Sequence, residues 1–270
     1  MKRVRHKFRE CFKLALHLAG SVAFGCVAAI ALHEAGHVLV ILGWGGEVTE
    51  IQLQPFTRSV VTYNIPVTAP HFGISAAGIF MGILGGAAFL ASLKTSRSPY
   101  ALPLAMAGVA SLLGNGLYLV LGSSILKGFG DPGRMIALGC PAQGLFAVGI
   151  CCLAAGGWAF MRSLPLTGLS PDMDHWRRDG VLLGGVFPYL TGIVIYNSIY
   201  DFPRLMRYCI FMAGILGMAL VGGWLSGDLS RCFFRGGYPR LEVRWRHAWT
   251  AVSAGAGVVI LELWTSGLFS

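Results

Sequence analysis

Two histidines and a glutamate near the N-terminus have the spacing of a zinc-hydrolase motif. His33 and His37 lie four residues apart, and Glu34 directly follows the first histidine. On a helix this spacing places both imidazoles on one face, where they can bind the same metal ion. Glu34 then lies beside the metal and can accept a proton from a metal-bound water molecule. The motif therefore predicts a Zn²⁺ site with His33 and His37 as ligands and Glu34 as the catalytic base.

The residues that flank this motif are apolar on every side of the expected helix. Segments 22–32 and 38–42 contain no charged residue, whereas the corresponding helix of a soluble metallopeptidase would be amphipathic. Hydrophobic residues make up 55% of the chain and charged residues only 12%, and the mean hydropathy is +0.65. These values are typical of a polytopic membrane protein and place the chain outside the range of soluble domains.

Apolar stretches of spanning length recur along the whole chain. They predict an all-α, multi-pass integral membrane protein with about seven transmembrane helices, although the pattern also fits six or eight. The first stretch follows a basic leader and so imitates a signal peptide, but it is too long for one, and cleavage would remove the motif. The predicted spans cover residues 14–42, 71–93, 101–121, 135–161, 181–200, 205–225 and 248–268.

A short β-hairpin is expected directly after the first span. Residues 46–64 alternate apolar and polar side chains on either side of a turn that contains Pro55, which is the pattern of two paired strands. We expect three regions along the chain. They are a basic N-terminal leader at 1–13, a metallopeptidase membrane core at 14–162 that includes the hairpin, and additional C-terminal transmembrane helices at 163–270.

The net charge of +9 does not indicate a nucleic-acid-binding protein. The basic residues lie in the leader and in short loops between the predicted spans, so the orientation of the chain in a lipid bilayer explains them more simply. With a cytoplasmic N-terminus, sixteen of the 21 lysines and arginines fall on the cytoplasmic side. The charge distribution therefore predicts that the N-terminus is cytoplasmic.

Three features resemble the site-2 protease family of intramembrane zinc metallopeptidases. They are the HEAGH segment at 33–37 near the end of the first span, the hairpin that follows, and the small-residue segment SAAGIFMG at 75–82. The resemblance covers residues 20–140 and implies that zinc is bound by the two histidines and by an aspartate from a later Asp-Gly motif. This sequence lacks the family's Asn-x-x-Pro…Leu-Asp-Gly string. Asn115 and Asp131 are the counterparts that it offers.

The third ligand is predicted from the side of the membrane to which the chain returns. His33 and His37 lie close to the end of the first span, and two further spans bring the chain back to that side at Asp131. Asp174 and Asp179 follow one more span and should emerge on the opposite side. We therefore expect Asp131 to complete the site. A miscounted or re-entrant helix would reverse this parity and favour Asp179 or Asp174, and an aspartate before Pro-Gly can also simply cap a helix.

These features predict an intramembrane zinc metalloprotease that hydrolyses peptide bonds in or near transmembrane segments of membrane-protein substrates. The alternative is a non-catalytic metal-binding membrane protein, either a transporter or a scaffold, in which the motif holds a metal without hydrolysis.

The two signals for the orientation of the chain in the membrane disagree. The charge distribution places the zinc toward the outer face, whereas the family resemblance implies a metal nearer the cytosol. The relative placement of His33, His37 and Asp131 is the same in either orientation.

Overall fold

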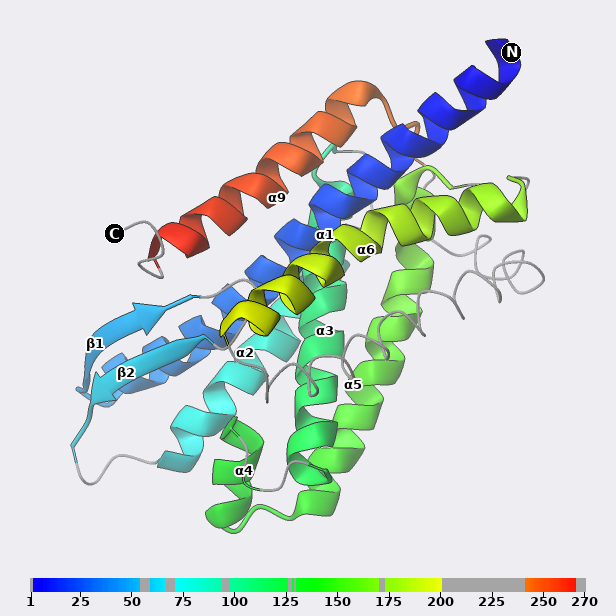
Figure 1. The fold of residues 1–270 in the computed structure, drawn as a ribbon. Helices are drawn as coiled ribbons and strands as arrows, with labels where there is room; N and C mark the ends of the chain where they lie inside the picture. The colour runs from blue at the N-terminus through cyan, green and yellow to red at the C-terminus, as the bar shows by residue number, and fades with distance from the viewer. Residues whose placement is uncertain are drawn as a thin grey trace.

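The computed structural model describes residues 2–53, 59–66, 71–93, 98–125, 128, 130–169, 173–200 and 241–265. These residues are mostly helical, with one two-stranded antiparallel sheet, as the sequence predicted (Figure 1). In chain order the elements are α1 (Lys2–Gly43), β1 (Glu47–Gln52), β2 (Val60–Asn64), α2 (His71–Ser92), α3 (Ala101–Ser123), α4 (Gly130–Ala137), α5 (Ala142–Ser163), the 3-10 helix η1 (Leu164–Thr167), α6 (His175–Tyr200) and α9 (Trp245–Thr265).

Four helical segments are long and apolar enough to cross a membrane. They are His6–Gly43, His71–Ser92, Ala101–Ser123 and Ala142–Thr167. The predicted spans 181–200 and 248–268 correspond largely to α6 and α9, which are helical but are not among these four. The predicted span 205–225 lies outside the described residues. The four helices fit the membrane protein expected from the composition, and the count of seven spans stays a prediction.

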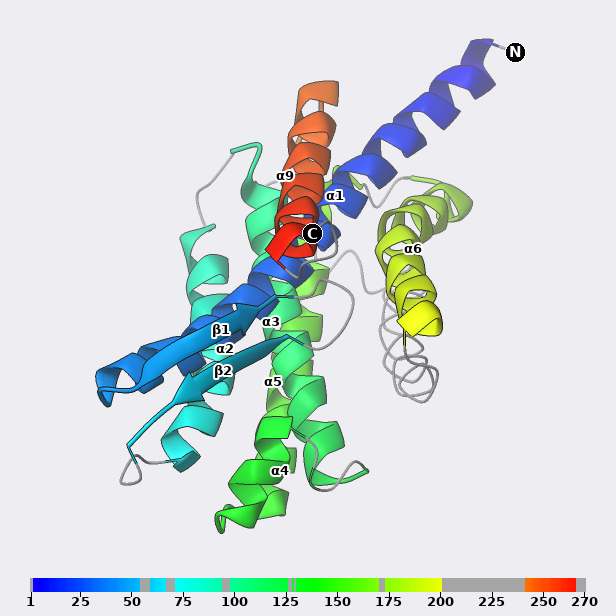
Figure 2. The same ribbon diagram turned by 60° about the vertical axis from the view of Figure 1, so that its left-hand side comes forward.

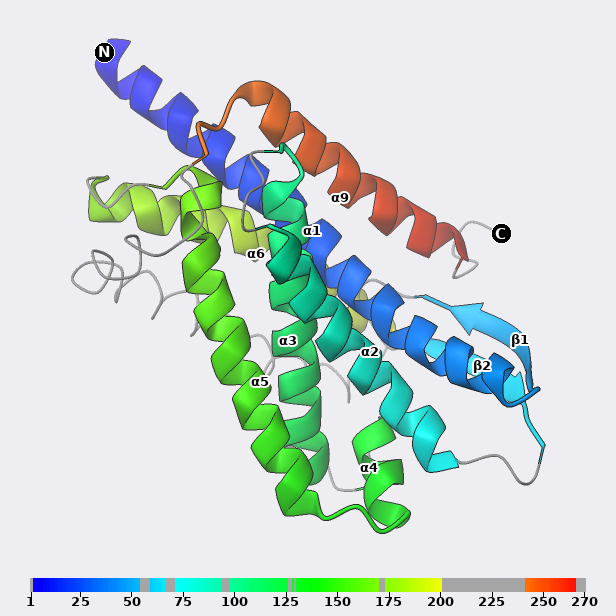
Figure 3. The ribbon, with the colours of Figure 1, turned by 180° about the vertical axis from the view of Figure 1, so that it is seen from behind.

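Residues 2–13 of the basic leader expected from the sequence are helical and continue without a break into the apolar part of α1. No proline or glycine interrupts the chain before Gly20, so nothing ends the helix between the basic and the apolar residues. With 42 residues, α1 is about 63 Å long, roughly twice the thickness of a bilayer's hydrocarbon core. Its N-terminal part projects beyond the other helices (Figure 3).

The hairpin prediction is confirmed. α1 ends just before Gly45, whose φ of 72° is left-handed, and the Gly46 N–H donates to the Ile41 carbonyl. This is a common way to satisfy the last carbonyls of a helix. β1 and β2 then pair in antiparallel register, with Glu47 opposite Asn64. Figure 2 shows the hairpin beside the C-terminal part of α1.

The prediction of a single span at 135–161 is wrong. Residues 130–137 form the short helix α4, and α5 begins only at Ala142. Gly139 has a φ of 97°, which a helix cannot continue through, and Pro141 at the start of α5 has no N–H to donate to a preceding turn. The chain therefore turns between α4 and α5, and α4 is free to pack beside α2 and α3.

α1 is the central helix of the fold. It packs against α2, α3, α6 and α9, and Figures 1 and 3 show α9 running alongside it. A small apolar cluster packs α4 against three longer helices. It contains residues of α2, α3, α4 and α5, namely Ala76, Ile79, Leu119, Met135 and Leu145. This cluster holds the short helix α4 in place, and α4 carries Asp131.

Candidate metal centre

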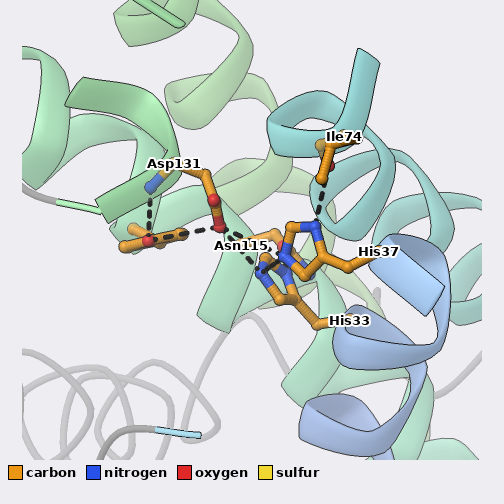
Figure 4. A network of polar contacts seen from close by, with 6 residues as sticks. His33, His37, Ile74, Asn115 and Asp131 are labelled. Carbon is orange, nitrogen blue, oxygen red and sulfur yellow. Dashed lines mark hydrogen bonds and ion pairs between the residues drawn. The ribbon is translucent and has the colours of Figure 1, made fainter. Parts of the chain in front are cut away.

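Three side chains from two distant parts of the sequence meet at one point (Figure 4). His33 and His37 come from α1, and Asp131 comes from the first turn of α4. Asp131 Oδ2 lies 3.2 Å from His33 Nε2 and 3.3 Å from His37 Nε2, and the two Nε2 atoms are 3.2 Å apart. The structure therefore places the Asp131 carboxylate beside both motif histidines.

The triangle formed by these three atoms has the dimensions of a zinc site. Zinc binds histidine nitrogen and carboxylate oxygen at about 2.0–2.2 Å in tetrahedral geometry, which separates neighbouring ligand atoms by about 3.3–3.6 Å. The three distances here are 3.2, 3.2 and 3.3 Å. Two imidazoles and one carboxylate are also a ligand set that zinc commonly takes when its fourth position is open. The residues present fit the metal that the motif predicts.

The outward-facing nitrogen of His37 has a fixed protonation state. His37 Nδ1 lies 2.7 Å from the backbone carbonyl oxygen of Ile74 on α2. A carbonyl oxygen only accepts hydrogen bonds, so Nδ1 carries the proton and donates it. The Nε2 atom of the neutral ring then presents its lone pair to the centre of the triangle, as a metal-binding histidine requires.

His33 is oriented in the same way by Asn115 on α3. Asn115 Nδ2 donates to the backbone carbonyl of Ser111 at 2.8 Å, which leaves the amide oxygen, Oδ1, facing His33 Nδ1 at 3.1 Å. His33 Nδ1 therefore carries the proton and donates it to this oxygen, and His33 Nε2 is left with a lone pair. Asn115, which the family resemblance singled out, thus fixes the tautomer of the first histidine.

The centre consequently gathers three acceptor atoms with no proton between them when both rings are neutral. Burial alone would raise the pKa of the Asp131 carboxyl, whereas hydrogen bonds and positive charge from protonated His33 and His37 lower it below its ordinary value. With neutral rings those donors are absent. The Asp131 side chain is only 13% exposed, so three buried acceptor atoms this close together require a cation between them, either a proton on an imidazole or a metal ion.

Gly78 on α2 makes room for this arrangement. An ideal Cβ at Gly78 would lie 2.5 Å from His37 Nε2 and 2.8 Å from His33 Nε2, both closer than van der Waals contact allows. Within the motif itself, a side chain at Gly36 would overlap the backbone carbonyl of Ala77. The small residues of α2 therefore let this helix pack directly against the face of α1 that carries both histidines.

Replacing Gly78 with alanine is expected to weaken zinc binding at least about tenfold, because the added methyl group displaces both Nε2 atoms from the triangle. Zinc affinity can be measured by competition with a chelator of known affinity. Gly157→Ala in α5 is a matched control, since a Cβ there meets nothing within 4 Å. If Gly78→Ala and Gly157→Ala bound zinc equally well, this account of the packing would be wrong.

The alternative aspartates lie elsewhere. Asp174 is 3.8 Å from Lys7 at the N-terminal end of α1. Lys7 precedes His33 by 26 residues of the same helix, which corresponds to about 39 Å. Asp179 is an exposed residue of α6, five residues further along. Neither aspartate belongs to the group of ligand atoms around the motif, whereas Asp131 does.

Glu34 lies beside the three converging side chains and is not one of them. It is 7% exposed and close enough to His37 for an electrostatic interaction between the two. A buried carboxylate next to a metal site is the feature that the motif requires of its base. The structure therefore places Glu34 next to the three ligand side chains but not among them.

Sequence reasoning did not find every residue of the centre. It assigned no role to Tyr118, which contacts Asp131, or to the Ile74 carbonyl, which fixes His37. Helical spacing could have indicated Tyr118, because it follows Asn115 by three residues and so shares its face of α3.

No protein-family model matches the chain, and no curated protein or solved structure matches it either.

Proposed function

We propose that this chain is an intramembrane zinc metalloprotease that hydrolyses peptide bonds in or near the transmembrane segments of membrane-protein substrates. The observation that carries the proposal is the convergence of His33 Nε2, His37 Nε2 and Asp131 Oδ2 at 3.2–3.3 Å from one another. It is supported by Glu34 beside this group and by the apolar α1 that carries the motif.

Each residue of the centre has a defined part in this chemistry. His33, His37 and Asp131 would hold Zn²⁺, which supplies a Lewis acid for a water molecule and for the scissile carbonyl. Glu34 accepts a proton from the attacking water and then delivers it to the leaving amine. Asn115 and the Ile74 carbonyl keep the Nδ1 protons in place, so both Nε2 lone pairs stay directed at the ligand position.

The position of the centre supports a transmembrane segment as the substrate. The motif lies in an apolar helical segment of spanning length, and the residues that complete it come from α2, α3 and α4 at one end of the bundle. A peptide bond that reaches such a site from the bilayer belongs to a transmembrane segment. That segment has to unwind locally, because its own hydrogen bonds otherwise occupy the scissile carbonyl.

Metal removal tests this proposal. We expect the purified protein to contain one zinc per chain, and to cleave single-span membrane peptides that carry helix-destabilising glycine or proline near the middle. A strong zinc chelator should abolish cleavage, and added zinc should restore it. Metal content is measured by mass spectrometry and cleavage by the appearance of product peptides in proteoliposomes.

The competing function, a non-catalytic metal-binding membrane protein, gives a different result in the same experiment. It would bind zinc in the same stoichiometry, because the same three side chains converge in either case, yet it would leave every peptide intact. Zinc binding without cleavage would therefore support a transporter or scaffold. Absence of zinc from protein purified without chelators, and failure to take it up afterwards, would overturn both functions.

A further inference from the structure

One side chain contacts Asp131 at two places. The hydroxyl of Tyr118 on α3 accepts a hydrogen bond from the Asp131 backbone N–H at 2.8 Å. The same hydroxyl lies 3.4 Å from Asp131 Oδ2 and donates toward it. Oδ2 is also the oxygen that faces His33 and His37. The Tyr118 hydroxyl therefore contacts both the backbone of Asp131 and the carboxylate oxygen that faces the two histidines.

The ring of Tyr118 also packs against the first histidine. Its centroid lies 5.8 Å from that of His33, and the two planes meet at 70°. This is the edge-to-face arrangement that aromatic rings favour. Tyr118 therefore links α4 to α1 through two of the three residues that converge at the centre.

The backbone beside Asp131 leaves space for this hydroxyl. Gly130 has a φ of 62°, and a Cβ on it would overlap the Tyr118 hydroxyl. An L-amino acid with a side chain is disfavoured here both by the positive φ and by this overlap. The glycine before Asp131 is thus needed for Tyr118 to reach the aspartate.

The start of a helix offers an aspartate a second orientation, away from the centre. An aspartate at the start of a helix commonly turns its carboxylate back onto the helix's own free N–H groups, and Asp131 stands in the first turn of α4. A carboxylate turned that way would not face the histidines. The Tyr118 hydroxyl offers Oδ2 a donor on the side of the centre instead, and it occupies the Asp131 N–H as well.

We infer that Tyr118 is a positioning residue that holds the Asp131 carboxylate in its metal-binding orientation. The inference rests on the proposed function, in which Asp131 binds zinc. It assigns the phenolic hydroxyl a part in metal affinity, because a ligand that is already oriented loses less conformational freedom when the metal binds. The aromatic ring contributes separately, through its contact with His33.

Tyr118→Phe tests the inference, since it removes the hydroxyl and keeps the ring. We expect zinc affinity to fall about 10- to 100-fold, the usual effect of losing an outer partner of a metal ligand. Affinity is measured by competition with a chelating fluorophore on the purified full-length protein. The zinc-free variant should keep the parental thermal stability, and its cleavage rate should return to near the parental value at saturating zinc.

Two further variants separate positioning from general stability. Tyr100→Phe, at the start of the same helix, removes an exposed tyrosine hydroxyl and should leave zinc affinity unchanged. Gly130→Ala should reproduce the loss seen in Tyr118→Phe, because its methyl group displaces the hydroxyl.

The outcomes distinguish the inference from the proposed function. If the parent protein binds zinc and Tyr118→Phe binds it equally tightly, the positioning role is wrong and the proposed function is unaffected. If zinc-free Tyr118→Phe loses thermal stability in proportion to its loss of affinity, Tyr118 has a purely structural role, which also overturns the inference. If the parent protein binds no zinc, the proposed function fails and the inference fails with it.

Discussion

Glu34→Gln is expected to abolish peptide hydrolysis while zinc remains bound. The substitution removes the proton acceptor and keeps the size of the side chain, and the three converging ligand atoms belong to other residues. A positioned general base contributes about 10²- to 10⁴-fold to a rate, so the cleavage rate should fall at least about 100-fold. Single-turnover cleavage in proteoliposomes measures the rate, and mass spectrometry of the same sample measures the zinc.

Glu10→Gln is the matched control for this variant. It makes the same substitution in the same helix, at a glutamate paired with Lys13 near the N-terminal end, and it should cleave at the parental rate. If Glu34→Gln also cleaved at the parental rate, the hydrolase mechanism would be wrong. Loss of zinc from Glu34→Gln would instead place Glu34 among the ligands and contradict its assignment as the base.

Asp131→Ala is expected to lose zinc. Two histidines alone rarely hold a metal tightly, and the variant removes the only carboxylate of the converging group. Removing a residue that only hydrogen-bonds a metal ligand weakens metal binding about 10- to 100-fold. Removing the ligand Asp131 itself should weaken zinc binding more, by over about 100-fold. Competition with a chelator measures it, and cleavage should disappear with the bound zinc.

Asp174→Ala and Asp179→Ala are the controls, because these aspartates are the alternative third ligands that the sequence left open. Asp174 lies near Lys7 at the opposite end of α1 from the motif, so its removal should leave zinc affinity at the parental value. The same result is expected for Asp179. Full zinc binding by Asp131→Ala together with loss of zinc from either control would show that the ligand choice is wrong and would leave the two histidines in place.

The sequence alone was sufficient for the part of the centre that depends on local geometry. His33, Glu34 and His37 lie within five consecutive residues of one helix, and helical periodicity fixes their relative directions wherever that helix packs. The hairpin at β1 and β2 was predictable for the same reason, since the alternation that forms it is also local.

The placement of Asp131 could be predicted because membrane topology restricts the chain to two sides. Two predicted spans after the motif return the chain to the side from which it left, and the structure does bring Asp131 to both histidines, although the predicted start of the fourth span was wrong. The turn at Gly139 and Pro141 separates α4 from α5, but it comes after Asp131 and does not alter the parity of the preceding spans.

Only the tertiary structure decided which atoms surround the ligands. Asn115 faces His33, the Ile74 carbonyl faces His37, and the Tyr118 hydroxyl faces Asp131. Each of these contacts depends on how closely α1, α2, α3 and α4 approach one another. That approach is set by side-chain packing over the whole interface, including the missing Cβ at Gly78. Spacing along a helix determines directions, whereas distances between helices follow from contacts that are remote in sequence.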